Sequence, residues 1–178
     1  MILKTSFTLI FLFFAFAKTT QAQELISGPL IEGFGETFTV PEADLPADPE
    51  KIYRGVFDIA QAPEDPAEVN LYFNTVARFI NMHAAAGVPV ENLKPVLVVH
   101  GSAAFDLLKN EFYREKFGVD NPNLPLLEAF HKLDVPMILC GQTAGKRDIP
   151  KEKRWEHTQI ALSAMTALIH YQNLGYAL

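Results

Sequence analysis

Two short apolar runs without charged residues stand out in the hydrophobic pattern of the chain, at residues 95–100 and 135–140. Runs of this kind predict strands that are buried on both faces, as in a parallel sheet. A third strand is expected at residues 51–60, which are rich in β-branched and aromatic side chains. Each apolar run is followed by a glycine, Gly101 or Gly141, at which the chain can turn sharply.

Between the predicted strands, apolar residues recur at three- and four-residue intervals, which is the spacing of an amphipathic helix. The pattern predicts helices at residues 67–86, 103–117 and 126–133, with Gly87 ending the first and Ser102 capping the second. Strands that alternate with helices indicate right-handed crossovers. The predicted fold class is therefore α/β, a three-layer sandwich with a mostly parallel sheet covered by helices on both faces.

The C-terminal forty residues have a less regular pattern. Residues 151–155 are polar and predict a short helix, and residues 176–178 predict a short final strand. Residues 158–163 fit either a strand or the start of a long helix that runs to Asn173, and the local pattern alone slightly favours the helix. The sequence pattern leaves this choice open.

The first 22 residues have the organisation of a secretory signal peptide. Lys4 gives a positive start, residues 6–17 form an apolar core, and Thr20 and Ala22 are the small residues that a signal peptidase reads. The apolar core stops at Lys18, short of the roughly 20 residues that a spanning helix needs. We therefore expect cleavage after Ala22 and a soluble periplasmic protein without a membrane anchor.

Residues 23–50, called the arm below, precede the α/β domain predicted at residues 51–178. The arm contains too many glycine and proline residues for a helix, so an extended conformation is expected. Its apolar side chains, such as Phe34, Phe38 and Leu45, cannot form a core of their own. We expect the arm to pack across the sheet or onto a neighbouring subunit.

Composition narrows the range of functions. The chain has 15 basic and 21 acidic residues, a net charge of −6, and removal of Lys4 and Lys18 with the leader makes it more acidic still. This balance argues against a nucleic-acid partner, which selects for a basic surface. The one cysteine and five scattered histidines show no zinc-site spacing, and neither glycine-rich nucleotide motif is present. No metal and no cofactor is expected.

Cys140 is the only cysteine, so it cannot form a disulfide within its own chain. It is either a small buried apolar residue or a thiol kept for its chemistry. His100, Ser102 and Gln142 also follow predicted strands, and the carboxyl ends of parallel strands form one edge of a sheet where ligands bind. On pattern alone, however, a structural role for His100 and a capping role for Ser102 are favoured.

Seven stretches in order along the chain resemble the exported branch of the DsrE/DsrF-like sulfur-relay family, which has the YchN-like fold. They are GPLIEGFG (28–35), KIYRGVFDIA (51–60), VARFINMHAAAGV (76–88), VLVVHGSA (96–103), DNPNLPLLEAF (120–130), LCGQT (139–143) and LSAMTALIHYQNLGYAL (162–178). The resemblance implies homo-oligomers, often trimers or hexamers. It also favours a strand at 158–163 and a separate helix at 164–173.

The resemblance further implies that a cysteine carries a persulfide and passes sulfur to a partner protein. Cys140 is the expected acceptor, with His100 as base or anion partner and the amides of Gly141 and Gln142 as anion holders. Ser102 and Asn121 complete the set of candidate binding residues. The leading hypothesis is a periplasmic sulfur carrier or sulfurtransferase-like protein.

Two alternatives remain for this fold. One is a non-catalytic oligomeric binding or assembly subunit in which Cys140 is buried. The other is a redox or soft-metal site made by Cys140 thiols that meet at an oligomer axis. Because a relay thiol must be reached by its partner, the accessibility of Cys140 separates these hypotheses.

Overall fold

The computed structural model describes residues 25–178, and the predicted leader therefore lies outside the described residues. Four strands form a parallel sheet in the order β3-β4-β5-β6: Tyr53–Ile59, Leu93–Val99, Met137–Cys140 and Gln159–Ala161. Strand order follows chain order, so every crossover moves the chain to the next position in the same direction. The sheet confirms the predicted α/β fold class and all three of the strands expected upstream of residue 150.

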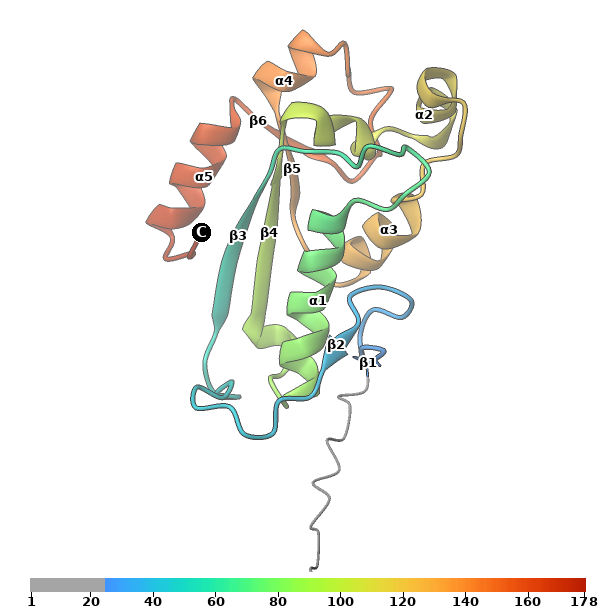
Figure 1. The fold of residues 1–178 in the computed structure, drawn as a ribbon. Helices are drawn as coiled ribbons and strands as arrows, with labels where there is room; N and C mark the ends of the chain where they lie inside the picture. Colours follow the sequence, from blue (N-terminus) through green and yellow to red (C-terminus); the bar gives the residue numbers. More distant parts are fainter. Residues whose placement is uncertain (1–24) are drawn as a thin grey trace, which may run out of the picture.

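The described residues form five α-helices around this sheet (Figure 1): α1 (Leu71–Ala85), α2 (Asn110–Phe117), α3 (Leu124–Lys132), α4 (Gly141–Lys146) and α5 (Ala164–Asn173). Because right-handed crossovers that all advance in one direction place their helices on one face, α1 and α3 cover the same side. Helix α5 follows the last strand and returns over the opposite side, against β3, β4 and β5. The result is the three-layer arrangement that the sequence predicts.

The hydrophobic core is divided by the sheet into two layers. The larger layer lies between the sheet and helices α1 and α3, and includes Phe73, Leu97 and Phe130. The smaller layer lies against α5 and consists of Val56, Val96, Val98, Ile138, Cys140, Ala164 and Ala167. Alternation along each strand decides which layer a side chain enters, so Cys140 faces α5.

The arm contains a two-stranded antiparallel pair, β1 (Leu25–Ile26) and β2 (Thr37–Phe38), and packs on α1 rather than directly across the sheet. Asn81 of α1, fully buried, holds it in place. The Asn81 side chain accepts the Ile31 N–H at 2.9 Å and donates to the carbonyls of Ile31 and Phe34, both at 2.9 Å. A single buried amide thereby satisfies several backbone groups of a segment that has little secondary structure of its own.

The region after β4 differs from the single helix expected at residues 103–117. A 3₁₀ helix, η2 (Gly101–Leu107), comes first, and α2 begins only at Asn110. The Ser102 hydroxyl does not cap a helix; it accepts the N–H of Ala62 at 2.9 Å. The apolar spacing continues through both elements, which is why one long helix was predicted.

The predictions for residues 151–178 are confirmed in part. Residues 159–161 form a strand and 164–173 a separate helix, as the family resemblance indicates, whereas the local pattern had slightly favoured one long helix. Residues 151–155 form turns instead of the predicted short helix. The expected final strand is reduced to a single parallel bridge between Ala177 and Gly55.

Candidate functional site

Cys140 is the last residue of β5 and the residue that precedes α4. It pairs in register with Ala161, the last residue of β6, after which the chain turns into α5. The sulfur-bearing residue therefore lies at the carboxyl edge of the sheet, where the first turns of α4 and α5 meet. This is the strand-end position that the sequence predicts.

The environment of Cys140 favours the thiolate. Burial raises the pKa of the Cys140 thiol and is the largest single influence. Hydrogen bonding from the Thr143 hydroxyl and from the N–H groups of Thr143, Ala164 and Gln142 outweighs it, so the pKa lies below its ordinary value.

The solvent access that the sulfur-carrier hypothesis expects of Cys140 is not present in the structure. The residue is 5% exposed and belongs to the apolar layer under α5. The cause is the strand pairing with Ala161 and the packing of Ala164 and Ala167 against the same layer. A reagent can reach the sulfur fully only if the segments around it move.

Gly141 and Gln142 follow Cys140 directly and form the start of α4. A Cβ atom on Gly141 would lie 2.7 Å from the carbonyl oxygen of Ala161, so only glycine lets α4 start this close to β6. Gln142 contributes its backbone N–H to the thiolate, and its side-chain Nε2 donates to the Leu162 carbonyl at 3.2 Å. The sequence analysis expected the backbone N–H groups of Gly141 and Gln142 to stabilise the thiolate. Gln142 does so, but Thr143 and Ala164 take the place of Gly141.

His100 is paired with Asp58, which the sequence analysis did not single out. The His100 Nε2 lies 2.8 Å from Asp58 Oδ1, and both side chains are partly exposed. A carboxylate only accepts, so Nε2 carries a hydrogen and the neutral ring keeps Nδ1 as its acceptor. The side chain of His100 is therefore hydrogen-bonded to Asp58 on the neighbouring strand β3 and not to Cys140.

The strand register nevertheless places His100 and Cys140 next to each other along the edge of the sheet. Val99 of β4 pairs with Leu139 of β5, and His100 and Cys140 follow these two residues. His100 has an extended backbone, so alternation points it to the face occupied by Val98, which is the face of α5. Asp58, His100 and Cys140 therefore follow one another across three adjacent strands on one face.

Ser102 and Asn121 have structural partners. The Ser102 hydroxyl tethers the segment that follows β3, as described above. Asn121 is buried, and its Nδ2 donates to the carbonyls of Asp106 at 3.0 Å and Leu108 at 2.7 Å, while its Oδ1 accepts from Asn123. With its amide group committed in this way, Asn121 supports the loops of the carboxyl edge and is not presented to a ligand.

Asp106 lies at the centre of the same buried network. Its Oδ2 accepts from Asn70 Nδ2 at 2.7 Å, and its Oδ1 has no hydrogen-bond partner among the described residues. Burial raises the pKa of Asp106 to about 7, although the bond from Asn70 acts in the opposite direction. Sequence reasoning missed this residue because an aspartate in an amphipathic stretch ordinarily lies in solvent.

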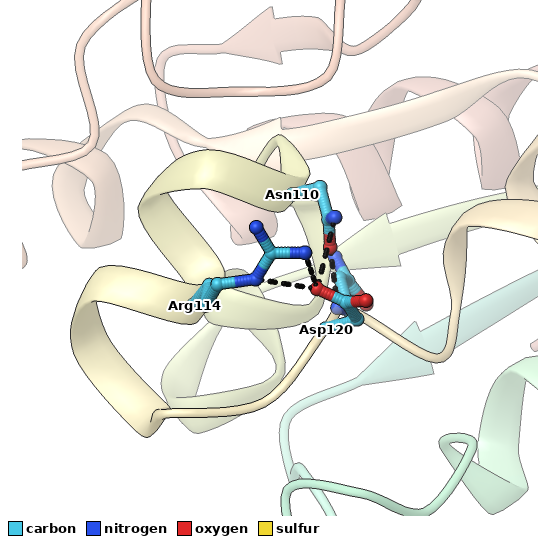
Figure 2. Close-up of polar contacts among 4 residues, drawn as sticks. Asn110, Arg114 and Asp120 are labelled. Atoms are coloured by element: carbon cyan, nitrogen blue, oxygen red, sulfur yellow. Dashed lines mark hydrogen bonds and ion pairs between the residues drawn. The ribbon is translucent and has the colours of Figure 1, made fainter.

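A second polar cluster fixes the turn that carries Asn121 (Figure 2). Arg114 donates to Asp120 Oδ1 through Nε at 2.7 Å and also through a second nitrogen, and Asn110 Nδ2 donates to the same oxygen at 3.1 Å. The bonds from Arg114 and Asn110 hold the pKa of Asp120 below its usual range. Asn110 also accepts the Asn121 N–H at 2.8 Å, which links this turn to the start of α2.

Across residues 25–178, no group of three or more His, Cys, Asp or Glu side chains is arranged to hold a metal ion. Within the same residues, no helix has the length and apolar character needed to cross a membrane.

Comparison with known proteins relates this fold to two solved structures. MTH1491, a protein of unknown function from Methanobacterium thermoautotrophicum, matches with a TM-score of 0.53 and 16% identity over 70% of this chain and 96% of its own. The ychN protein from E. coli matches with a TM-score of 0.51 and 20% identity over 68% of this chain and 93% of its own. At these identities the likeness shows a shared fold. A search of curated proteins finds no match.

The sequence also matches a described protein family over most of its length. The match covers residues 54–178, from the second residue of β3 through α5 to Leu178. The chain belongs to the DsrE/DsrF-like family.

Proposed function

We propose that the protein is a sulfur carrier, or a sulfurtransferase-like protein, in which Cys140 accepts a sulfur atom as a persulfide. The observation that carries the proposal is the position of Cys140 at the carboxyl end of β5, directly before α4 and beside the end of β6. Donors at this position favour a thiol pKa below its ordinary value despite the burial of the residue. A buried apolar residue has no need of four hydrogen-bond donors, whereas a nucleophilic thiolate does. The family resemblance adds sulfur relay as the matching chemistry.

The chemistry is a displacement at sulfur. With thiosulfate as donor, the Cys140 thiolate attacks the outer sulfur, a new S–S bond forms, the S–S bond of thiosulfate breaks, and sulfite leaves with the electron pair. No external oxidant or reductant is required. The persulfide is again an anion, so the donors of Thr143, Ala164 and Gln142 that favour the thiolate also favour the product.

His100 and Asp58 have supporting roles in this proposal. The Asp58 carboxylate fixes the orientation of the His100 ring, and Nδ1 is then the acceptor for the thiol proton. For this to happen the ring must turn toward Cys140 on the adjacent strand. Movement of the segments around Cys140 would supply the access that sulfur transfer needs as well.

The second candidate is a non-catalytic binding or assembly subunit with Cys140 as a packing residue. Its support is the 5% exposure of Cys140 and its contacts with apolar neighbours in the layer under α5. Under this reading the hydrogen-bond donors are a by-product of two helices that start nearby.

Mass spectrometry of the native protein separates the two candidates. After exposure to thiosulfate or polysulfide and removal of the excess, the sulfur-carrier proposal requires the mass of one added sulfur atom, located at Cys140 by peptide mapping. Cys140→Ser serves as the control and should gain nothing. Native protein that remains unmodified, while the urea-unfolded chain is modified, would favour the assembly subunit.

The proposed location is the periplasm, reached by cleavage of the leader after Ala22. Support comes from the residue pattern of positions 1–22 alone. N-terminal sequencing of the protein from an expressing bacterium should start at Gln23. An intact Met1 on membrane-bound protein would contradict this location.

A further inference from the structure

A pocket of about 520 Å³ lies between the arm and the C-terminal half of α1. Tyr53, the first residue of β3, forms part of its wall. Cys140 is the last residue of β5, and the two strands are parallel, so the pocket and Cys140 lie at opposite edges of the sheet. The pocket therefore serves no role in the chemistry proposed for Cys140.

The lining of the pocket is apolar and carries no charged side chain among the described residues. Phe38, Val40, Leu45 and Met82 are large apolar side chains of the lining, and all four remain exposed. Leu45 is the extreme case at 94% exposed. The volume falls in the range of small-molecule sites, roughly 300–1,000 Å³, and an occupant would remove this apolar surface from water.

Tyr53 and His83 in the lining have hydrogen-bonding capacity left over. Tyr53 Oη accepts the Asp48 N–H at 2.6 Å, which leaves the phenol hydrogen to be donated. His83 Nδ1 lies 2.8 Å from the carbonyl oxygen of Phe79, which can only accept, so the neutral ring keeps Nε2 as an acceptor. The two rings are in contact, with centroids 4.6 Å apart. A donor and an acceptor are therefore carried by two rings that are in contact at the pocket wall.

These features define the chemistry of an occupant. A hydroxyl group can accept from Tyr53 and donate to His83 at once, whereas a charged group would be desolvated without a counter-charge. The rings of Phe38, Tyr53 and His83 offer flat apolar surfaces that suit an aromatic body. We propose that this pocket binds a neutral aromatic molecule that carries a hydroxyl group.

The test uses 2-naphthol, naphthalene and naphthalene-2-sulfonate as probes with the purified protein, followed by calorimetry or fluorescence. We expect saturable one-to-one binding of 2-naphthol, with at least tenfold weaker binding of the sulfonate. Tyr53→Phe and His83→Phe should each weaken 2-naphthol by about two- to tenfold, the range for one lost hydrogen bond, and leave naphthalene within about twofold.

Ala85→Trp places an indole in the pocket and should reduce the affinity for 2-naphthol at least tenfold. Ala67→Trp, also at an exposed position and just before the other end of α1, is the matched control and should bind as the wild type does. Circular dichroism of each variant confirms the fold. Absence of saturable 2-naphthol binding, equal affinity in Ala85→Trp, or equal affinity for the sulfonate would each overturn the proposal.

Discussion

The side chain of Gln142 donates to the backbone carbonyl of Leu162 at 3.2 Å and so ties the first turn of α4 to the segment that follows β6. Cys140 lies between these two segments, since it precedes α4 and pairs with Ala161. The bond joins exposed residues and therefore contributes little stability. It is well placed to control access to the Cys140 thiol.

Removal of this bond should make Cys140 easier to reach. Gln142→Ala is expected to raise the rate of iodoacetamide alkylation of the folded protein several-fold, because the two segments can separate more often. Gln172→Ala is the matched control: Gln172 Nε2 also donates to a backbone carbonyl, that of Leu168 at 3.3 Å, but on α5 beyond the site. Equal rates in wild type and Gln142→Ala would show that the bond does not limit access.

The Thr143 hydroxyl should lower the pKa of Cys140 measurably. Thr143→Val keeps the shape of the side chain and removes the donor, so the pH at which alkylation reaches half its maximal rate should rise. Thr75→Val provides the control, because the Thr75 hydroxyl donates to the Leu71 carbonyl on α1. An unchanged midpoint in Thr143→Val would remove this hydroxyl from the account of the thiolate.

The stability of the protein should fall as the pH rises toward neutrality because of Asp106. Its pKa is raised by burial from 3.8 unfolded to about 7 folded, so the folded state binds the proton more tightly. The resulting stability is fully present below about pH 4 and is lost as the pH rises through about 7, with a total on the order of 4 kcal/mol.

Asp106→Asn cannot ionise, so its unfolding free energy should be nearly flat across this range and exceed that of the wild type at pH 8. Urea unfolding followed by circular dichroism at pH 4 to 8 measures both curves. Asp134→Asn, at an exposed position, serves as the control and should retain the wild-type slope. A wild-type slope in Asp106→Asn would contradict the assignment.

We expect a homo-oligomer, and the outer face of β6 and α5 is the surface that supports it. Ile160, Leu162, Met165 and Ile169 are large apolar residues exposed there. Met165→Glu should reduce the mass measured by light scattering at micromolar concentration to that of a monomer. Leu71→Glu on α1 is the control, since both residues are 72% exposed. A monomeric wild-type protein would reject the oligomer but not the fold.

Most of the fold could be predicted from the sequence, because buried parallel strands have a continuous apolar pattern that few other elements share. The strands at 95–100 and 135–140 and the helix over 67–86 were found within a few residues of their bounds. The break between η2 and α2 was not predicted, because it depends on long-range hydrogen bonds such as the one that the Trp155 N–H donates to the Leu107 carbonyl at 2.8 Å. The position of the arm could not be predicted either, because it depends on hydrogen bonds to the buried Asn81, a polar residue within the apolar face of α1.

The candidate site was only partly predictable. The placement of Cys140 and His100 at neighbouring strand ends follows from glycine after each apolar run. The hydrogen-bond partners of these two residues could not be predicted, because Asp58 and Ala164 come from segments that only the order of the strands brings close to them. The sequence left open whether Cys140 is buried or exposed, because its burial results from α5 returning over the sheet.

The most direct test of the central claim is the rate at which Cys140 reacts with iodoacetamide at pH 6, in folded protein and in the urea-unfolded chain. An unperturbed thiol, with a pKa of about 8.5, is scarcely ionised at this pH. We predict that the folded protein reacts faster than the unfolded chain, because the favoured thiolate outweighs the restricted access to Cys140 as the surrounding segments move, and that Cys140→Ser shows no reaction. Folded protein that resists alkylation until it is unfolded would contradict the claim and leave Cys140 as a packing residue.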